Sequence, residues 1–207
     1  MCNTIIIGQN DKFFLDQFAQ YNEFQNWYNF WADSFPNTEF NKLKFEHKNS
    51  LILKKNPLDS ENIEHLTNRS FTLNYNKTDK ISIDLYPDVS FIDVSEDGSL
   101  LVIGRDADPA LKIYDFNNAS EYYYTSGPTS FYDESIWTSD TSLAVFGVSF
   151  WPGQDSFQNL IVLKVIINRE TLIIDIYLSD ELPWKSSWTD YMNFKYPTIK
   201  LGFGNKK

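Results

Sequence analysis

The chain has little of what many catalytic or cross-linked proteins depend on. Among 207 residues it has one cysteine, Cys2, and two histidines, His47 and His65. A single cysteine excludes an intrachain disulfide, and neither histidine has a cysteine or histidine neighbour at the spacing of a zinc site. The phosphate loop, the dinucleotide fingerprint and the Gly-x-Ser-x-Gly elbow are missing from the sequence. We therefore predict no metal and no cofactor, and the sequence identifies no reaction.

Long apolar runs and clustered positive charge are also missing. No stretch reaches the roughly 18 apolar residues of a transmembrane helix, and the start Met-Cys-Asn-Thr-Ile-Ile-Ile-Gly lacks the charged region of a signal peptide. These features favour a cytoplasmic protein, although a lipoprotein freed of its leader would also begin Met-Cys, with Cys2 as the lipidation site. The net charge of −10 argues against binding to nucleic acid or membranes and favours a basic protein partner.

Aromatic residues are abundant, with 17 Phe, 12 Tyr and 6 Trp, and 42% of the chain is hydrophobic. This composition predicts a folded protein with a core rich in aromatic rings. We expect one domain over 1–207, in which a helical and connecting region at 1–67 precedes a β-rich body at 68–207.

The N-terminal region shows helical periodicity from Asp11 until Pro36, which ends it. The stripe recurs in steps of three and four and consists of Phe14, Phe18, Tyr21, Phe24, Tyr28, Trp31 and Phe35. It predicts an amphipathic helix, broken at most once, that either docks on a sheet or presents a binding face. The connector at 40–66 is expected to hold one short strand around 51–53 and a short helix at 60–66.

Two segments of the β-rich body echo each other 43 residues apart. Residues 95–104 and 138–147 keep Asp, Ser, Leu, Val and Gly in register, and this period is the length of a four-stranded propeller blade. Alternating apolar residues predict a hairpin at 71–85 and strands at 89–94, 99–104 and 110–116. The second unit starts near Glu134 and continues into strands at 160–167 and 172–178.

A turn at 168–171 would set the pairing of these last two strands and place Lys164 opposite Asp175. Since these are the only charges in either strand, we interpret them as a structural pair that supports the register. In the tail, the spacing of Trp184, Trp188 and Tyr191 predicts a short helix, followed by a strand at 198–203.

The first unit resembles a blade of the WD40-like or periplasmic-type β-propellers. Its Ser-Glu-Asp-Gly turn at 95–98 joins two strands, and Tyr114-Asp115 stands where WD40 blades have Trp-Asp. Two units and one hairpin are too few for a closed ring. We therefore expect an α+β fold of mostly antiparallel sheet, with two blade-like units, an N-terminal amphipathic helix and a short C-terminal helix. The resemblance implies partner recognition more than chemistry.

Our first functional hypothesis is a protein-binding module, because large rings and loop carboxylates are typical of recognition surfaces. The composition resembles that of immunity proteins, which neutralise bacterial toxins. An alternative is a carbohydrate-binding or glycoside-hydrolysing protein, in which rings stack on sugars and two loop acids act. A third is a subunit that assembles with copies of itself. The candidate anchors and loop acids are Tyr122, Tyr123, Tyr124, Trp151, Trp184, Asp106, Asp108, Asp133 and Glu134.

Overall fold

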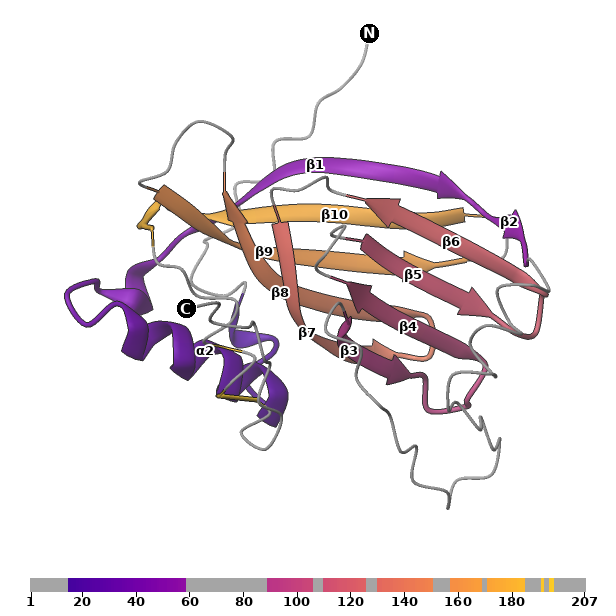
Figure 1. Cartoon of the computed structure of the whole chain (residues 1–207), viewed down its shortest axis with the longest axis horizontal. Coiled ribbons are helices and arrows are strands. Elements are labelled where there is room, and N and C mark those ends of the chain that lie inside the picture. The colour runs from indigo at the N-terminus through magenta and orange to yellow at the C-terminus, as the bar shows by residue number, and fades with distance from the viewer. Residues whose placement is uncertain are drawn as a thin grey trace, which may run out of the picture.

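The computed structural model describes residues 15–58, 89–105, 110–125, 130–150, 157–168, 171–184, 191 and 194–195. They form three layers, in which a helix and a five-stranded sheet lie on opposite sides of a six-stranded sheet (Figure 1). All strand pairs are antiparallel. The prediction of an α+β fold with mostly antiparallel sheet is thereby confirmed.

The six-stranded sheet, here sheet A, has the order β1-β10-β9-β8-β7, with β11 paired to β9. Its strands are β1 (Phe45–Lys54), β7 (Ser130–Ser139), β8 (Ser142–Phe150), β9 (Phe157–Ile167), β10 (Thr171–Ser179) and β11 (Leu182–Pro183). The five-stranded sheet, sheet B, has the order β2-β6-β5-β4-β3. Its strands are β2 (Asn56–Pro57), β3 (Val89–Val94), β4 (Leu100–Arg105), β5 (Ala110–Asp115) and β6 (Ser120–Thr125).

The helical layer consists of α2 (Asn22–Ser34), with the short 3-10 helix η1 (Phe40–Lys42) after it. The predicted helix is interrupted by a turn at 17–20, so that α2 begins at Asn22, and it ends two residues before Pro36. Its apolar stripe packs on sheet A, as the docking alternative predicted. Within the described residues no helix is long and apolar enough to cross a membrane.

Two hydrophobic cores follow from this layering. The core between the sheets takes the inward side chains of both, including Val102 and Ile113 from sheet B and Val145 and Leu163 from sheet A. The core under the helix joins Phe18, Phe24, Trp27, Trp31 and Phe35 to the other face of sheet A, at Ala144, Phe146, Leu160 and Val162. Trp27 was missing from the predicted stripe, although its spacing to Phe24 and Trp31 is also helical.

Several strand predictions are confirmed and one is wrong. Strand β3 occupies the predicted 89–94, β4 is shifted by one residue from the predicted 99–104, and β5 ends one residue before the predicted 116. The β9–β10 pairing places Lys164 opposite Asp175, as predicted. The short strand expected around 51–53 is instead the ten-residue β1, because its pairing with β10 extends order into a polar sequence. The predicted hairpin at 71–85, helix at 60–66 and strand at 198–203 lie outside the described residues.

The 43-residue echo corresponds to two meanders, β3-β4-β5-β6 and β7-β8-β9-β10. Both first strands skip a residue of the ladder at echoing positions, Ser90 in β3 and Asp133 in β7, which are 43 positions apart; β7 also skips Thr138. The following turns differ, since Gly98 has a φ of 74° whereas Asp140-Thr141 closes a tighter turn. The described sheets stack face to face and form no closed barrel, so the propeller-blade interpretation stays a prediction.

The bulge in β7 brings its backbone against Gly147 of β8. A Cβ atom at position 147 would collide with the carbonyl oxygen of Phe131, which belongs to the backbone and has no rotamer to adjust. A Cβ atom at Gly104, the echoing position in β4, would meet the ring of Phe91 instead.

We expect Gly147→Ala to destabilise the protein more than Gly104→Ala, because a backbone clash needs strand movement whereas a ring can turn. Gly147→Ala should lower the free energy of unfolding by about 3 kcal/mol or more, the range of severe steric substitutions. Urea unfolding of both variants and the wild type measures this difference. Equal losses would show that the β7 backbone yields as easily as the Phe91 ring.

Candidate functional site

The helical layer covers only part of the outer face of sheet A, the face turned away from sheet B. The covered part lies around Phe146, Val162 and Tyr177. Beyond it, two cross-strand rows of β1, β10 and β9 reach the surface. We call these two rows the open face and define it by Ile52, Ile173, Ile166, Ser50, Asp175 and Lys164.

The first row of the open face is aliphatic. Ile52 pairs with Ile173, and Ile173 pairs with Ile166. Ile52 is 69% exposed and Ile166 is 44% exposed. Neighbouring side chains in such a row lie within contact distance, about 4.5–5.5 Å between Cβ atoms. The row is therefore one continuous aliphatic strip on the surface.

The second row of the open face is polar. The Ser50 hydroxyl donates to Asp175 Oδ1 at 2.6 Å, and His47 Nε2 lies 3.0 Å from Ser50 Oγ. Lys164 Nζ lies 5.4 Å from the centre of the Tyr177 ring. Burial lowers the pKa of Lys164, and the charge of Asp175 opposes that shift. This row offers a carboxylate, a hydroxyl and an amine to a molecule that covers the aliphatic strip.

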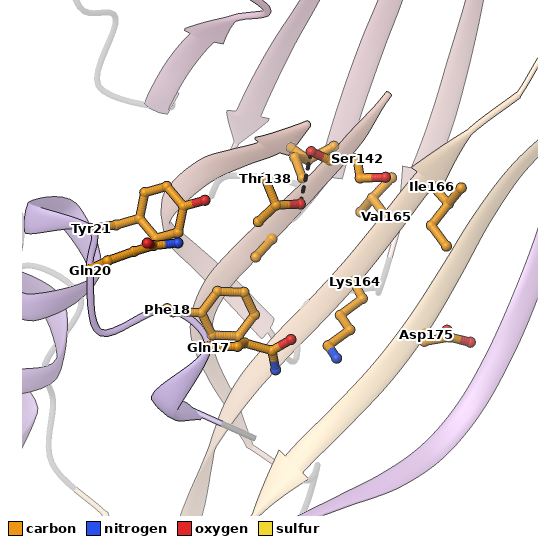
Figure 2. A pocket seen from close by; sticks show the side chains of 12 residues that line it. Gln17, Phe18, Gln20, Tyr21, Thr138, Ser142, Lys164, Val165, Ile166 and Asp175 are labelled. Atoms are coloured by element: carbon orange, nitrogen blue, oxygen red, sulfur yellow. Dashed lines mark hydrogen bonds between the residues drawn. The ribbon is translucent and has the colours of Figure 1, made fainter. Parts of the chain in front are cut away.

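An open groove of about 360 Å³ borders these rows (Figure 2). One wall is the turn at 17–21, with Gln17, Phe18 and Tyr21, and the floor comes from β8, β9 and β10. In Figure 2 the Gln17 amide and the Lys164 amine point toward each other. The groove is therefore mixed, with polar side chains such as Lys164 and Asp175 beside apolar ones such as Ala144 and Ile166.

A second cluster of polar groups lies buried where α2, β7 and β3 meet. The Trp27 indole donates to Asp133 Oδ2 at 2.9 Å, and Asp133 is fully buried at the β7 bulge. Burial raises the pKa of Asp133 to about 7, against the opposing effects of the Trp27 hydrogen bond and the Lys195 charge. In β3, burial likewise raises the pKa of Asp93 to about 6, and the Ser135 hydroxyl donates to its Oδ2 at 3.1 Å.

Glu134 extends this cluster toward the C-terminal region. Lys195 Nζ lies 2.8 Å from Glu134 Oε1, and the Tyr191 hydroxyl donates to Oε2 at 3.1 Å. Lys195 also donates to the Asp133 carbonyl oxygen at 3.2 Å. These contacts join the bulge to α2 and to residues near the C-terminus, and they occupy both carboxylates inside the protein.

The predicted placement of Asp133 and Glu134 in a loop is therefore wrong. Both lie in the interior of β7, because a bulge turns consecutive side chains of this strand inward. The other two candidate acids, Asp106 and Asp108, lie outside the described residues.

The candidate aromatic anchors are not brought together. Alternation along β6 turns Tyr122 and Tyr124 into the core between the sheets, so neither is an exposed anchor as we expected. Tyr123 points outward from sheet B and is 43% exposed, with Lys112 Nζ 5.6 Å from its ring centre. Trp184 follows β11 and is 40% exposed. Trp151 lies outside the described residues.

The aliphatic strip was not among the predicted features, although the sequence carries a signal for it. The predicted register placed Lys164 opposite Asp175, and a charged pair marks a sheet face that water reaches. Residues two positions along each strand share that face, which leads to Ile166 and Ile173. Their exposure could thus have been predicted from the register, whereas the part played by Ile52 required the pairing of β1 with β10.

Comparison with known proteins finds no family model, no curated protein and no solved structure that matches this chain. Among the described residues, no three His, Cys, Asp or Glu side chains are grouped so that they could hold a metal ion.

The buried acids predict how stability depends on pH. A carboxyl whose pKa rises from 3.8 to about 7 on folding stabilises the fold below pH 3.8, and that contribution is lost as pH rises to 7. At about 1.4 kcal/mol per pKa unit, this is a loss of a few kcal/mol. Asp133→Asn keeps an oxygen for Trp27 and has no proton to lose. We expect its free energy of unfolding to fall less between pH 4 and 7 than that of the wild type.

The matched control is Asp140→Asn, which makes the same substitution in the exposed β7–β8 turn. Urea unfolding at a series of pH values measures all three proteins. If Asp133→Asn follows the wild-type curve, Asp133 is not the group that titrates.

Proposed function

We propose that this chain is an intracellular protein-binding module that contacts its partner through the open face of sheet A. The specific form we propose is an immunity-type protein that covers a functional surface of a toxin. The observation that carries the proposal is the exposed row Ile52–Ile173–Ile166 beside a polar row and a groove.

The exposure of this row favours a macromolecular partner. Single apolar side chains on a surface are ordinary, but a contiguous aliphatic strip with a polar border is typical of interaction sites. Covering Ile52 and Ile166 would release water from apolar surface, at about 25 cal/mol per Å². The polar row of Ser50, Asp175 and Lys164 would then fix the orientation of the partner by hydrogen bonds and charge.

Charge supports a basic partner. The net charge of −10 creates an attractive field for cations, and such a field raises association rates more than it raises affinity. A toxin that acts on nucleic acid or on anionic lipid would carry the opposite charge. This is the physical basis for the proposed immunity role.

The carbohydrate alternative depends on two accessible carboxylates beside an exposed ring. Asp133 and Glu134 are buried and bonded to Trp27, Lys195 and Tyr191, so this pair does not support it. Tyr123 is on the outward side of sheet B, whereas Trp184 follows β11 of sheet A, so these two rings would not stack on one sugar. We therefore prefer protein recognition.

The test compares two substitutions at opposite ends of β9. Ile166 lies on the open face and Phe157 does not, while each is 44% exposed. We expect the wild type and Phe157→Glu to capture the same partner from the native cells. The amount of that partner captured by Ile166→Glu should be at least tenfold lower. Quantitative affinity capture measures this, and unfolding midpoints check that both variants fold.

With the purified partner, the association rate should fall as ionic strength rises from about 0.05 to 0.5 M, since the Debye length falls several-fold. If the partner is a toxin, cells that express it should stop growing, and co-expression of this chain should restore their growth. Equal capture by Ile166→Glu and Phe157→Glu would remove the open face from the proposal, and an unchanged association rate would remove the charge argument.

A further inference from the structure

Strand β1 forms one edge of sheet A and runs along the top of the molecule in Figure 1. It is ten residues long, and the side chains from Glu46 to Ser50 are exposed, as are Ile52 and Lys54. Its hydrogen-bonded neighbour within the described residues is β10 alone. An exposed edge strand presents unpaired N–H and C=O groups on which another strand can align.

The middle of β1 reads the same in both directions. Leu51-Ile52-Leu53 is flanked by Ser50 and Lys54. An antiparallel copy centred on Ile52 would place Ile52 opposite Ile52, Leu51 opposite Leu53 and Ser50 opposite Lys54. Each apolar side chain then meets another apolar side chain, Lys54 meets the neutral hydroxyl of Ser50, and no like charges face each other.

The two faces of the sheet also match in this register. Leu51 and Leu53 pack toward the core between the sheets, while Ile52 lies on the outer face. A two-fold axis normal to the sheet leaves inner residues inner and outer residues outer. The aliphatic row Ile166–Ile173–Ile52 would therefore continue into the same row of the second copy, in reverse order.

We propose that a second copy of this chain pairs with β1 about a two-fold axis at Ile52. The paired segment is short, since the β1–β10 register shifts between His47 and Asn49 and the chain leaves sheet A for β2 after Lys54. These features restrict pairing to about residues 50–54. Lys48 lies outside this segment, so its charged side chain does not face the second copy.

This register favours a second copy over an unrelated strand, because the segment is its own complement and closed two-fold dimers are the commonest oligomers. The inference does not rest on the proposed function: the two contacts share Ile52, but the dimer pairs the β1 edge, and the outer surface of the row stays accessible in the dimer. The response to salt distinguishes the dimer from the complex with a basic partner. Two copies of charge −10 repel each other, so screening should strengthen the dimer, whereas it should slow association with a basic partner.

Cysteine cross-linking tests the register in a Cys2→Ser background. Opposite Cα atoms in an antiparallel pair lie about 4.5–5.5 Å apart, which is within the span of a disulfide. Ile52→Cys should therefore give a disulfide-linked dimer on mild oxidation. Ser50→Cys alone and Lys54→Cys alone should not, since equivalent atoms lie about 13 Å apart. A mixture of these two variants should cross-link.

Sedimentation equilibrium of the full chain, from about 1 µM to 1 mM and at low and high salt, tests the dimer without cross-linking. We expect Ile52→Lys, which sets two ammonium groups across the axis, to raise the dissociation constant at least tenfold. The control Phe157→Lys makes the same charge change at an exposed site on another strand and should leave the dissociation constant unchanged. A monomer at every concentration would overturn the proposal, as would cross-linking of Ser50→Cys alone as efficiently as Ile52→Cys.

Discussion

Burial of sheet A on both faces is the constraint on which the rest of this structure depends. Sheet B covers one face along the strands, so the apolar side chains of β8 and β9 are buried there without interruption. The other face is covered by α2, whose 13 residues span about 20 Å. Strand β9 has 11 residues and is about 35 Å long. Along β9 the helical layer covers Leu160 and Val162 and leaves Ile166 exposed, and this uncovered remainder is the open face.

The helix is held on the sheet by a hydrogen bond from Trp27 to Asp133, a buried carboxyl whose ionised form is disfavoured by its surroundings. The bulge at Asp133 turns a carboxylate into the core, where Trp27 donates to it, and Gly147 leaves room for the displaced backbone. Desolvation of a carboxylate costs several kcal/mol unless it is paired or protonated. The same repeat position in β3 is Ser90, which carries no charge. Both meanders therefore have a bulge at this position, but only the bulge in β7 carries a carboxyl that accepts a hydrogen bond from the helix.

The proposed binding face and the β1 edge both lie in the part of sheet A that the helix leaves uncovered. Ile52 belongs to both, because it is the outer residue of the aliphatic row and the centre of the symmetric segment. Pairing at this edge would join two open faces into one longer surface. A partner with two-fold symmetry, or an extended partner, would then gain contacts from both copies without any new interaction type.

Local patterns determined β3, β4, β5, β9 and β10 to within a few residues, the end of α2 before Pro36 and the pairing of Lys164 with Asp175, because alternation, prolines and turn lengths act over a few residues. They did not determine which strands share a sheet or which face is buried. The length of β1, the burial of Tyr122 and Tyr124, and the position of Asp133 in the core depend on contacts between residues far apart in the chain. Alternation separates a strand into two faces, but only the neighbouring layer decides which of them meets water.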